Sequence, residues 1–161
     1  MPPTSSIPSD QQSRTNSVFL HLASFLKFII PLAGVIVPLI IWSAHRDKEF
    51  VDANGRQAIN FQLSLILYKF LLLIACIPVF VIMIGDLVAL SEAMEKYDSI
   101  LSLFSVSVAL TWFVILLIIL SLISVFEIIV VILAAVKASG GLVYRYPLSI
   151  GFIRKESQAT V

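Results

Sequence analysis

Two ionisable side chains lie inside long apolar stretches, and they are the residues best placed to support chemistry. Lys69 interrupts the apolar stretch 59–85, and Glu127 is the charged residue of the stretch 99–136. Along a helix that rises ~1.5 Å per residue, each lies about 15 Å from the basic end of its stretch. An unpaired charge at that depth in a membrane costs ~2.5–3.5 kcal/mol. We therefore predict that Lys69 and Glu127 are partners, either in a structural ion pair or in a functional pair that relays protons or contacts a substrate.

A second polar feature lies just before Lys69. Four residues at helical spacing share one predicted helix face: Gln57, Asn60, Ser64 and Tyr68. In lipid, such a face must meet either protein or water.

The sequence lacks the motifs of common catalytic and cofactor sites. It has no H-E-x-x-H, no G-x-S-x-G, no glycine-rich phosphate loop and no Cys/His cluster. His21 and His45 are predicted to lie at the membrane interfaces rather than to catalyse a reaction. We predict no catalytic, cofactor-binding or metal-binding residues, and a protein that is not an enzyme. The net charge of +1 also argues against nucleic acid as a partner.

Composition places the chain in a membrane. It has 161 residues, of which 59% are hydrophobic and 13% charged, with a mean hydropathy of +1.01. Soluble domains carry about a quarter charged residues. The stretch 99–136 contains no Gly, Pro, Asn or Asp, and it exceeds the length needed to cross a bilayer. We predict an all-α, polytopic membrane protein.

The apolar stretches predict three membrane spans in one integral membrane domain, 18–153. The spans are 18–43, 59–85 and 110–137, with an amphipathic interfacial helix at 86–108 between the last two. The alternative is four spans, with a hairpin inside 99–136. The tails 1–17 and 154–161 are predicted to be disordered and flexible, respectively. In the first span, Pro31 and Pro38 predict a kinked helix, and Gly34 between them offers a close-approach surface.

The distribution of basic residues predicts the orientation. With three spans, seven Lys and Arg residues share one side with the C-terminus, and two, Arg14 and Lys96, lie on the other. The positive-inside rule then places the N-terminus outside and the C-terminus in the cytoplasm. Lys27 is predicted to extend toward the headgroups of the outer face.

Three stretches together resemble a known family. They are His21-Leu22 with the segment 38–42, the block FVDANGRQAINFQ at 50–62, and AAVKASG at 134–140 leading to YRYPL at 144–148. They are similar to a bacterial family of small membrane proteins that is grouped with the twenty-kilodalton, channel-associated subunit of the chloroplast inner-envelope protein translocon. The motif positions are Phe50, Asp52, Gly55, Arg56, Asn60, Phe61, Gln62, Lys137, Gly140, Tyr144, Arg145, Tyr146 and Pro147.

Physical roles can be assigned to several motif positions. Asp52 suits a helix cap, Asn54-Gly55 a turn or a close approach, and Asn60 and Gln62 hydrogen bonds between helices. The segment 144–146 is typical of an aromatic and basic anchor at the membrane interface.

The resemblance implies a bacterial inner-membrane protein and distantly suggests protein translocation. We predict a non-enzymatic assembly or accessory subunit that contacts the lipid bilayer and other membrane proteins or copies of itself. The alternative is a small oligomeric channel or transporter that uses Lys69 and Glu127.

Overall fold

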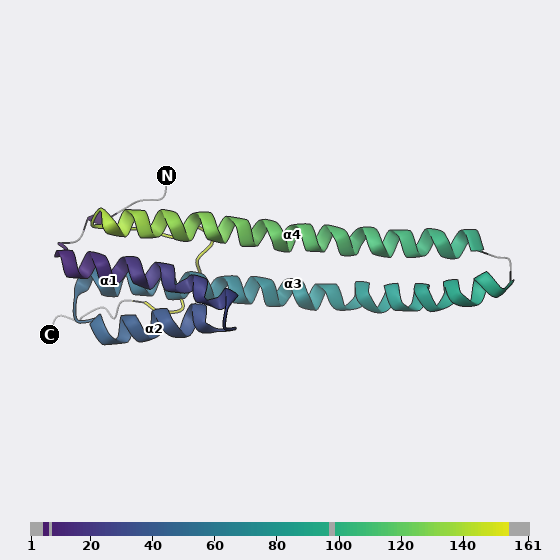
Figure 1. Cartoon of the computed structure of the whole chain (residues 1–161), viewed down its shortest axis with the longest axis horizontal. Coiled ribbons are helices and arrows are strands. Elements are labelled where there is room, and N and C mark those ends of the chain that lie inside the picture. Colours follow the sequence, from purple (N-terminus) through teal and green to yellow (C-terminus); the bar gives the residue numbers. More distant parts are fainter. Residues whose placement is uncertain (1–4, 7, 97–98, 155–161) are drawn as a thin grey trace. The chain divides into compact units, whose positions relative to one another are not determined.

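The computed structural model describes residues 5–6, 8–96 and 99–154 and is helical apart from one short strand pair (Figure 1). The helices are α1 (Gln11–Leu22), the 3-10 helix η1 (Ala23–Phe28), α2 (Ala33–His45), α3 (Glu49–Lys96) and α4 (Ser99–Ser139). The strands β1 (Ser5–Ser6) and β2 (Leu142–Val143) pair in antiparallel fashion. The prediction of an all-helical class is therefore confirmed.

The chain divides into two compact units. Unit 1 contains the residues up to Ile66 and those from Phe126 onward, and unit 2 is Leu67–Val125. Unit 1 holds α1, η1, α2, the first part of α3, the last part of α4 and the C-terminal segment that follows α4. Unit 2 holds the remaining parts of α3 and α4, whose apolar side chains are largely exposed.

The prediction that residues 18–43 form one membrane-spanning helix is wrong. The chain reverses after η1, so that α1 and η1 pack against α2 as a helical hairpin (Figure 1). Pro31 explains the break, because the residue before a proline avoids helical geometry and the proline has no N–H. Leu32 then adopts a left-handed conformation with φ 68° and is the N-cap residue of α2. Pro38, by contrast, lies inside α2.

Gly34 allows the two arms of the hairpin to approach closely. A Cβ at Gly34 would lie 2.7 Å from the carbonyl oxygen of Ser24 in η1. The predicted close-approach surface is therefore present, but it joins two arms of one hairpin.

Two helices among the described residues are long and apolar enough to cross a membrane. They are the stretches Glu49–Val88 of α3 and Leu110–Ser139 of α4, whereas the apolar helix Ala33–His45 is shorter. The expected interfacial helix at 86–108 is not a separate element. α3 continues to Lys96, and α4 begins at Ser99, with 97–98 outside the described residues. Residues 11–17, which were expected in a disordered tail, form the first turns of α1. The predicted flexible tail lies outside the described residues from 155 onward.

The core of unit 1 combines Leu20 of α1 with small and apolar positions of the motif stretches. Leu20, Val51 and Ala58 form a buried cluster against which Ile41 and Trp42 pack. On α4, Ala134 and Ala138 are fully buried, so the small residues of that helix let it approach its neighbours closely.

Candidate functional site

The centre of unit 1 is a buried chain of polar side chains from three separate segments. His21 of α1 is 0% exposed, and its Nε2 lies 3.0 Å from Oδ1 of Asn54 on α3. Its Nδ1 lies 2.8 Å from the hydroxyl of Tyr146 in the C-terminal segment. Asn54 in turn donates through Nδ2 to the carbonyl of Phe50, at 2.9 Å. The cluster His21–Asn54–Tyr146 therefore ties α1, α3 and the C-terminal segment together.

The hydrogen-bond pattern fixes the tautomer of His21. Because Asn54 donates through its nitrogen to Phe50, its oxygen must accept, and Nε2 of His21 must carry the proton. Nδ1 is then the acceptor, and the Tyr146 hydroxyl donates to it. Burial lowers the pKa of His21 to about 4, although the hydrogen bond to Asn54 raises it in part. Burial, with Tyr144 alongside, also raises the pKa of Tyr146 above its ordinary value. Both groups are therefore neutral near pH 7.

The C-terminal segment is held on α3 by two residues of the predicted polar face. Nδ2 of Asn60 donates to the carbonyl of Ile153 at 3.0 Å, and Oδ1 of Asn60 accepts from the Ile153 N–H at 2.8 Å. Oγ of Ser64 accepts from the N–H of Ile150 at 2.7 Å and donates to the Asn60 carbonyl at 2.7 Å. At these two positions the face meets protein, because the side chains satisfy the backbone of a segment without regular structure.

The other two residues of that face have different surroundings. Gln57 is half-buried in unit 1, and Tyr68 belongs to unit 2.

Aromatic rings complete the attachment of the C-terminal segment. Tyr146 stacks on Phe61 of α3, with ring centroids 4.2 Å apart, and meets Tyr144 edge-on at 5.4 Å. Both tyrosines are buried, while Arg145 between them is exposed. The expected interfacial anchor of tyrosines is therefore wrong, since these rings belong to the core. His21 was likewise expected at an interface and lies in the same core.

Glu127 is 1% exposed and receives a hydrogen bond from the ammonium of Lys27 in η1. Lys27 was expected to extend toward headgroups, and this expectation is wrong. The reversal of the chain before α2 carries Lys27 to the depth of Glu127 on α4. Lys69 belongs to unit 2, and its pairing with Glu127 stays a prediction.

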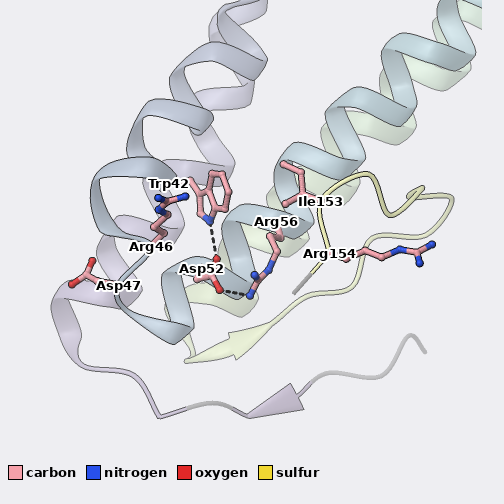
Figure 2. Close-up of a pocket in the computed structure, with 7 residues that line it drawn as sticks. All are labelled: Trp42, Arg46, Asp47, Asp52, Arg56, Ile153 and Arg154. Atoms are coloured by element: carbon pink, nitrogen blue, oxygen red, sulfur yellow. Dashed lines mark hydrogen bonds and ion pairs between the residues drawn. The ribbon is translucent and has the colours of Figure 1, made fainter. Parts of the chain in front are cut away.

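A pocket of about 450 Å³ opens where α2 gives way to α3 (Figure 2). It is lined by Trp42, Arg46, Asp47, Asp52, Arg56, Ile153 and Arg154. Nε1 of Trp42 donates to Oδ1 of Asp52 at 3.0 Å, and Arg56 forms an ion pair with the other oxygen of that carboxylate. Asp52 therefore fastens α2 to α3 and does not cap the helix, which begins earlier, at Glu49.

Two arginines of this pocket have no carboxylate partner in the described part of the chain. The guanidinium carbon of Arg46 lies 5.9 Å from the centroid of the Trp42 ring, and neither Arg46 nor Arg154 forms an ion pair with any described residue. In Figure 2, the carboxylate of Asp47 points away from Trp42. Guanidinium groups in contact with water suit phosphate or carboxylate groups as ligands. Within the described part of the chain, no three His, Cys, Asp or Glu residues gather as a metal site.

With this geometry established, comparison with known proteins identifies the family. Residues 12–153 match the magnetosome magnetite crystal formation protein family, MamF/MmsF. The chain belongs to this family. The matched residues run from α1 to the end of the C-terminal segment, and so include every element of the buried cluster. No curated protein and no solved structure matches the chain.

The family corrects the resemblance drawn from the motifs. The block at 50–62 and the stretches at 134–140 and 144–148 belong to a MamF/MmsF protein and not to a relative of the chloroplast translocon subunit. The link to protein translocation has no support. The coarser expectation, a helical and membrane-associated accessory protein, agrees with the family.

The structure explains why several motif residues are needed. A Cβ at Gly55 would lie 2.1 Å from Cδ1 of Trp42, so only glycine leaves room for that ring. Gly55 thus serves a close approach, and the expected turn at Asn54-Gly55 is absent because α3 runs through both residues. Gln62 is buried, and its Nε2 has no hydrogen-bond partner among the described residues. Lys137, Gly140 and Arg145 are exposed, and Pro147 is half-buried.

The cluster His21–Asn54–Tyr146 was missed from the sequence. One signal for part of it was present, because Phe50, Asn54, Ala58 and Phe61 follow a helical repeat and share one face of α3. That face places Asn54 among apolar residues and predicts a buried amide. Nothing in the spacing indicates that its partners are His21 and Tyr146.

Proposed function

We propose that this chain is a non-enzymatic accessory protein of the magnetosome membrane, and that it supports magnetite crystal formation by assembling with other membrane proteins or with copies of itself. The observation that carries the proposal is the family match over residues 12–153. Two helices that are long and apolar enough to cross a membrane support the location. A bacterial inner membrane is the alternative location, and cell fractionation distinguishes the two.

The use of the buried polar groups supports a structural role. His21, Asn54 and Tyr146 bond to one another, while Asn60 and Ser64 bond to the backbone of the C-terminal segment. Groups committed to internal hydrogen bonds are costly to release for chemistry, because a buried unsatisfied group costs ~1–3 kcal/mol. This arrangement favours a rigid platform over a reactive centre.

The exposed faces of unit 2 support assembly within a membrane. Apolar side chains such as Phe70, Leu73 and Ile82 on α3, and Trp112 and Leu117 on α4, are between 49% and 60% exposed. These faces suit lipid chains or the helices of partner proteins.

Deletion of the gene in a magnetite-forming host tests the proposal. We expect crystals of altered size or number in electron micrographs, and restoration by a tagged wild-type copy. The tagged protein should fractionate with magnetosomes and, after crosslinking, purify with other membrane proteins or as a homo-oligomer. Crystals that are unchanged by the deletion would refute the proposed function.

A small oligomeric channel or transporter is the competing function, and the burial of the Glu127 carboxylate is the observation that favours it. Complementation with Glu127→Gln separates the two. If the variant is as abundant and heat-stable as wild type but fails to restore the crystals, the carboxylate acts in transport. If it restores them, the accessory role stands.

A further inference from the structure

In the hairpin formed by α1, η1 and α2, the returning arm α2 is too short to cross a bilayer. α2 has 13 residues, which corresponds to ~20 Å, whereas the hydrocarbon layer is ~30 Å thick. The chain enters the hairpin through α1, reverses at 29–32 and returns through α2. Both ends of the hairpin therefore lie on one side, whatever surrounds it.

The tip of the hairpin is apolar and exposed. Phe28, Ile29, Ile30 and Leu32 are between 62% and 78% exposed. A cluster of large apolar side chains at the tip of a turn is costly in water, at ~25 cal/mol per Å² of apolar surface, and favourable in lipid. The opposite end of the hairpin carries the polar residues Asp10, Arg46 and Asp47.

Several backbone N–H groups of the tip are paired within the hairpin. The N–H groups of Ile29 and Ile30 donate to the carbonyl of Leu26, and the N–H of Ala33 donates to the carbonyl of Ile30. Pro31 has no N–H to satisfy. These internal bonds lower the cost of placing the turn in lipid, where an unsatisfied backbone N–H is costly.

The charge next to the tip is paired as well. Lys27 bonds to Glu127, which lies ten residues before Lys137 on α4. That separation corresponds to ~15 Å, about half the hydrocarbon thickness. The ion pair therefore fixes the tip near the middle of the bilayer.

We propose that this hairpin is a re-entrant element, which enters the hydrocarbon layer from the side of the C-terminal segment, contacts acyl chains with Phe28, Ile29, Ile30 and Leu32, and returns to the same side. The protein then has two spans, α3 and α4, and its N-terminal and C-terminal segments share one face of the membrane. This replaces the N-terminus-outside orientation that followed from three spans.

Direct contacts place the segment before α1 beside the elements of that face. β1 pairs with β2, which follows α4, with Ser5 opposite Val143. Asp10 forms an ion pair of 3.1 Å with Lys48, which lies between α2 and α3. Residues on opposite sides of a bilayer could not make these contacts.

The distribution of basic residues becomes more asymmetric in this arrangement. Eight now lie on the side of the two termini, and one, Lys96, lies on the other. The eight are Arg14, Arg46, Lys48, Arg56, Lys137, Arg145, Arg154 and Lys155. The three-span arrangement gives seven against two, because it separates Arg14 from the rest. The positive-inside rule thus favours the re-entrant hairpin, with both termini in the cytoplasm.

Thiol labelling tests the side of the N-terminal segment. In full-length protein carrying Cys76→Ser, single cysteines are placed at Gln11, Asp47 and Ser91, all of which are exposed. The variants are produced in the inner membrane of a heterologous bacterium, and an impermeant maleimide is applied to its intact and to its permeabilised spheroplasts. We expect Gln11→Cys to behave like Asp47→Cys and to react only after permeabilisation, whereas Ser91→Cys reacts in intact spheroplasts. If Gln11→Cys reacts together with Ser91→Cys, the hairpin crosses the membrane and the proposal is wrong.

A second measurement tests insertion of the tip. A spin label at Ile29→Cys is compared with one at the exposed Thr15→Cys, in vesicles of phosphatidylethanolamine and phosphatidylglycerol. We expect molecular oxygen to relax the label at position 29 more strongly than a water-soluble nickel chelate does, with the reverse order at position 15. Stronger relaxation by the chelate at position 29 would place the tip in water and overturn the proposal.

Discussion

Replacement of Tyr146 by phenylalanine isolates the contribution of one buried hydrogen bond. Tyr146→Phe removes the hydroxyl that lies 2.8 Å from Nδ1 of His21 and keeps the ring that stacks on Phe61. His21 is 0% exposed, so no water replaces the lost donor and Nδ1 remains unsatisfied. The cost of leaving a buried polar group without a partner is ~1–3 kcal/mol, and we expect the free energy of unfolding to fall by that amount.

The chain offers a matched control in Tyr144. Tyr144 is also buried, and its ring meets the ring of Tyr146 edge-on. Its hydroxyl, however, has no hydrogen-bond partner among the described residues. Tyr144→Phe should therefore change the free energy of unfolding by less than ~0.5 kcal/mol. Unfolding is followed in detergent by circular dichroism for both variants. Equal losses, or none for Tyr146→Phe, would refute the hydrogen-bonded cluster as a source of stability.

Three further predictions follow from the contacts of unit 1. His21 has a pKa of about 4 in the folded protein against an ordinary value of 6.5, so below pH 6.5 the unfolded chain binds a proton that the folded chain does not. The free energy of unfolding should therefore fall by on the order of 3 kcal/mol as the pH drops from 6.5 to 4. In His21→Leu the free energy of unfolding should depend less on pH over this range. Gly55→Ala should destabilise the protein and alter Trp42 fluorescence, whereas Gly85→Ala, which meets nothing within 4 Å, should be neutral or stabilising by ~0.5–1 kcal/mol. Asn60→Leu should release the C-terminal segment and speed tryptic cleavage at Arg145 in detergent, while Gln57→Leu should leave the cleavage rate unchanged.

The sequence by itself determined the helical class and the apolar character of two long helices. Those properties depend on composition and on run length, which are local and additive along the chain. The sequence also indicated that Asn60 and Ser64 share a face that must meet protein or water, because helical spacing alone brings them together. The block at 50–62 was identified as distinctive, although its family was misassigned.

Tertiary structure decided what the local pattern could not. The apolar stretch 18–43 has the length of a span, and Pro31 alone is compatible with a kink or with a reversal. The reversed arrangement also contains contacts distant in sequence, namely Lys27 with Glu127 and β1 with β2, which the local pattern does not indicate. The partners of His21 lie 33 and 125 residues away, on α3 and in the C-terminal segment. Periodicity reports which face of a helix is buried, but not which segment covers it, since that choice depends on the packing of the whole unit.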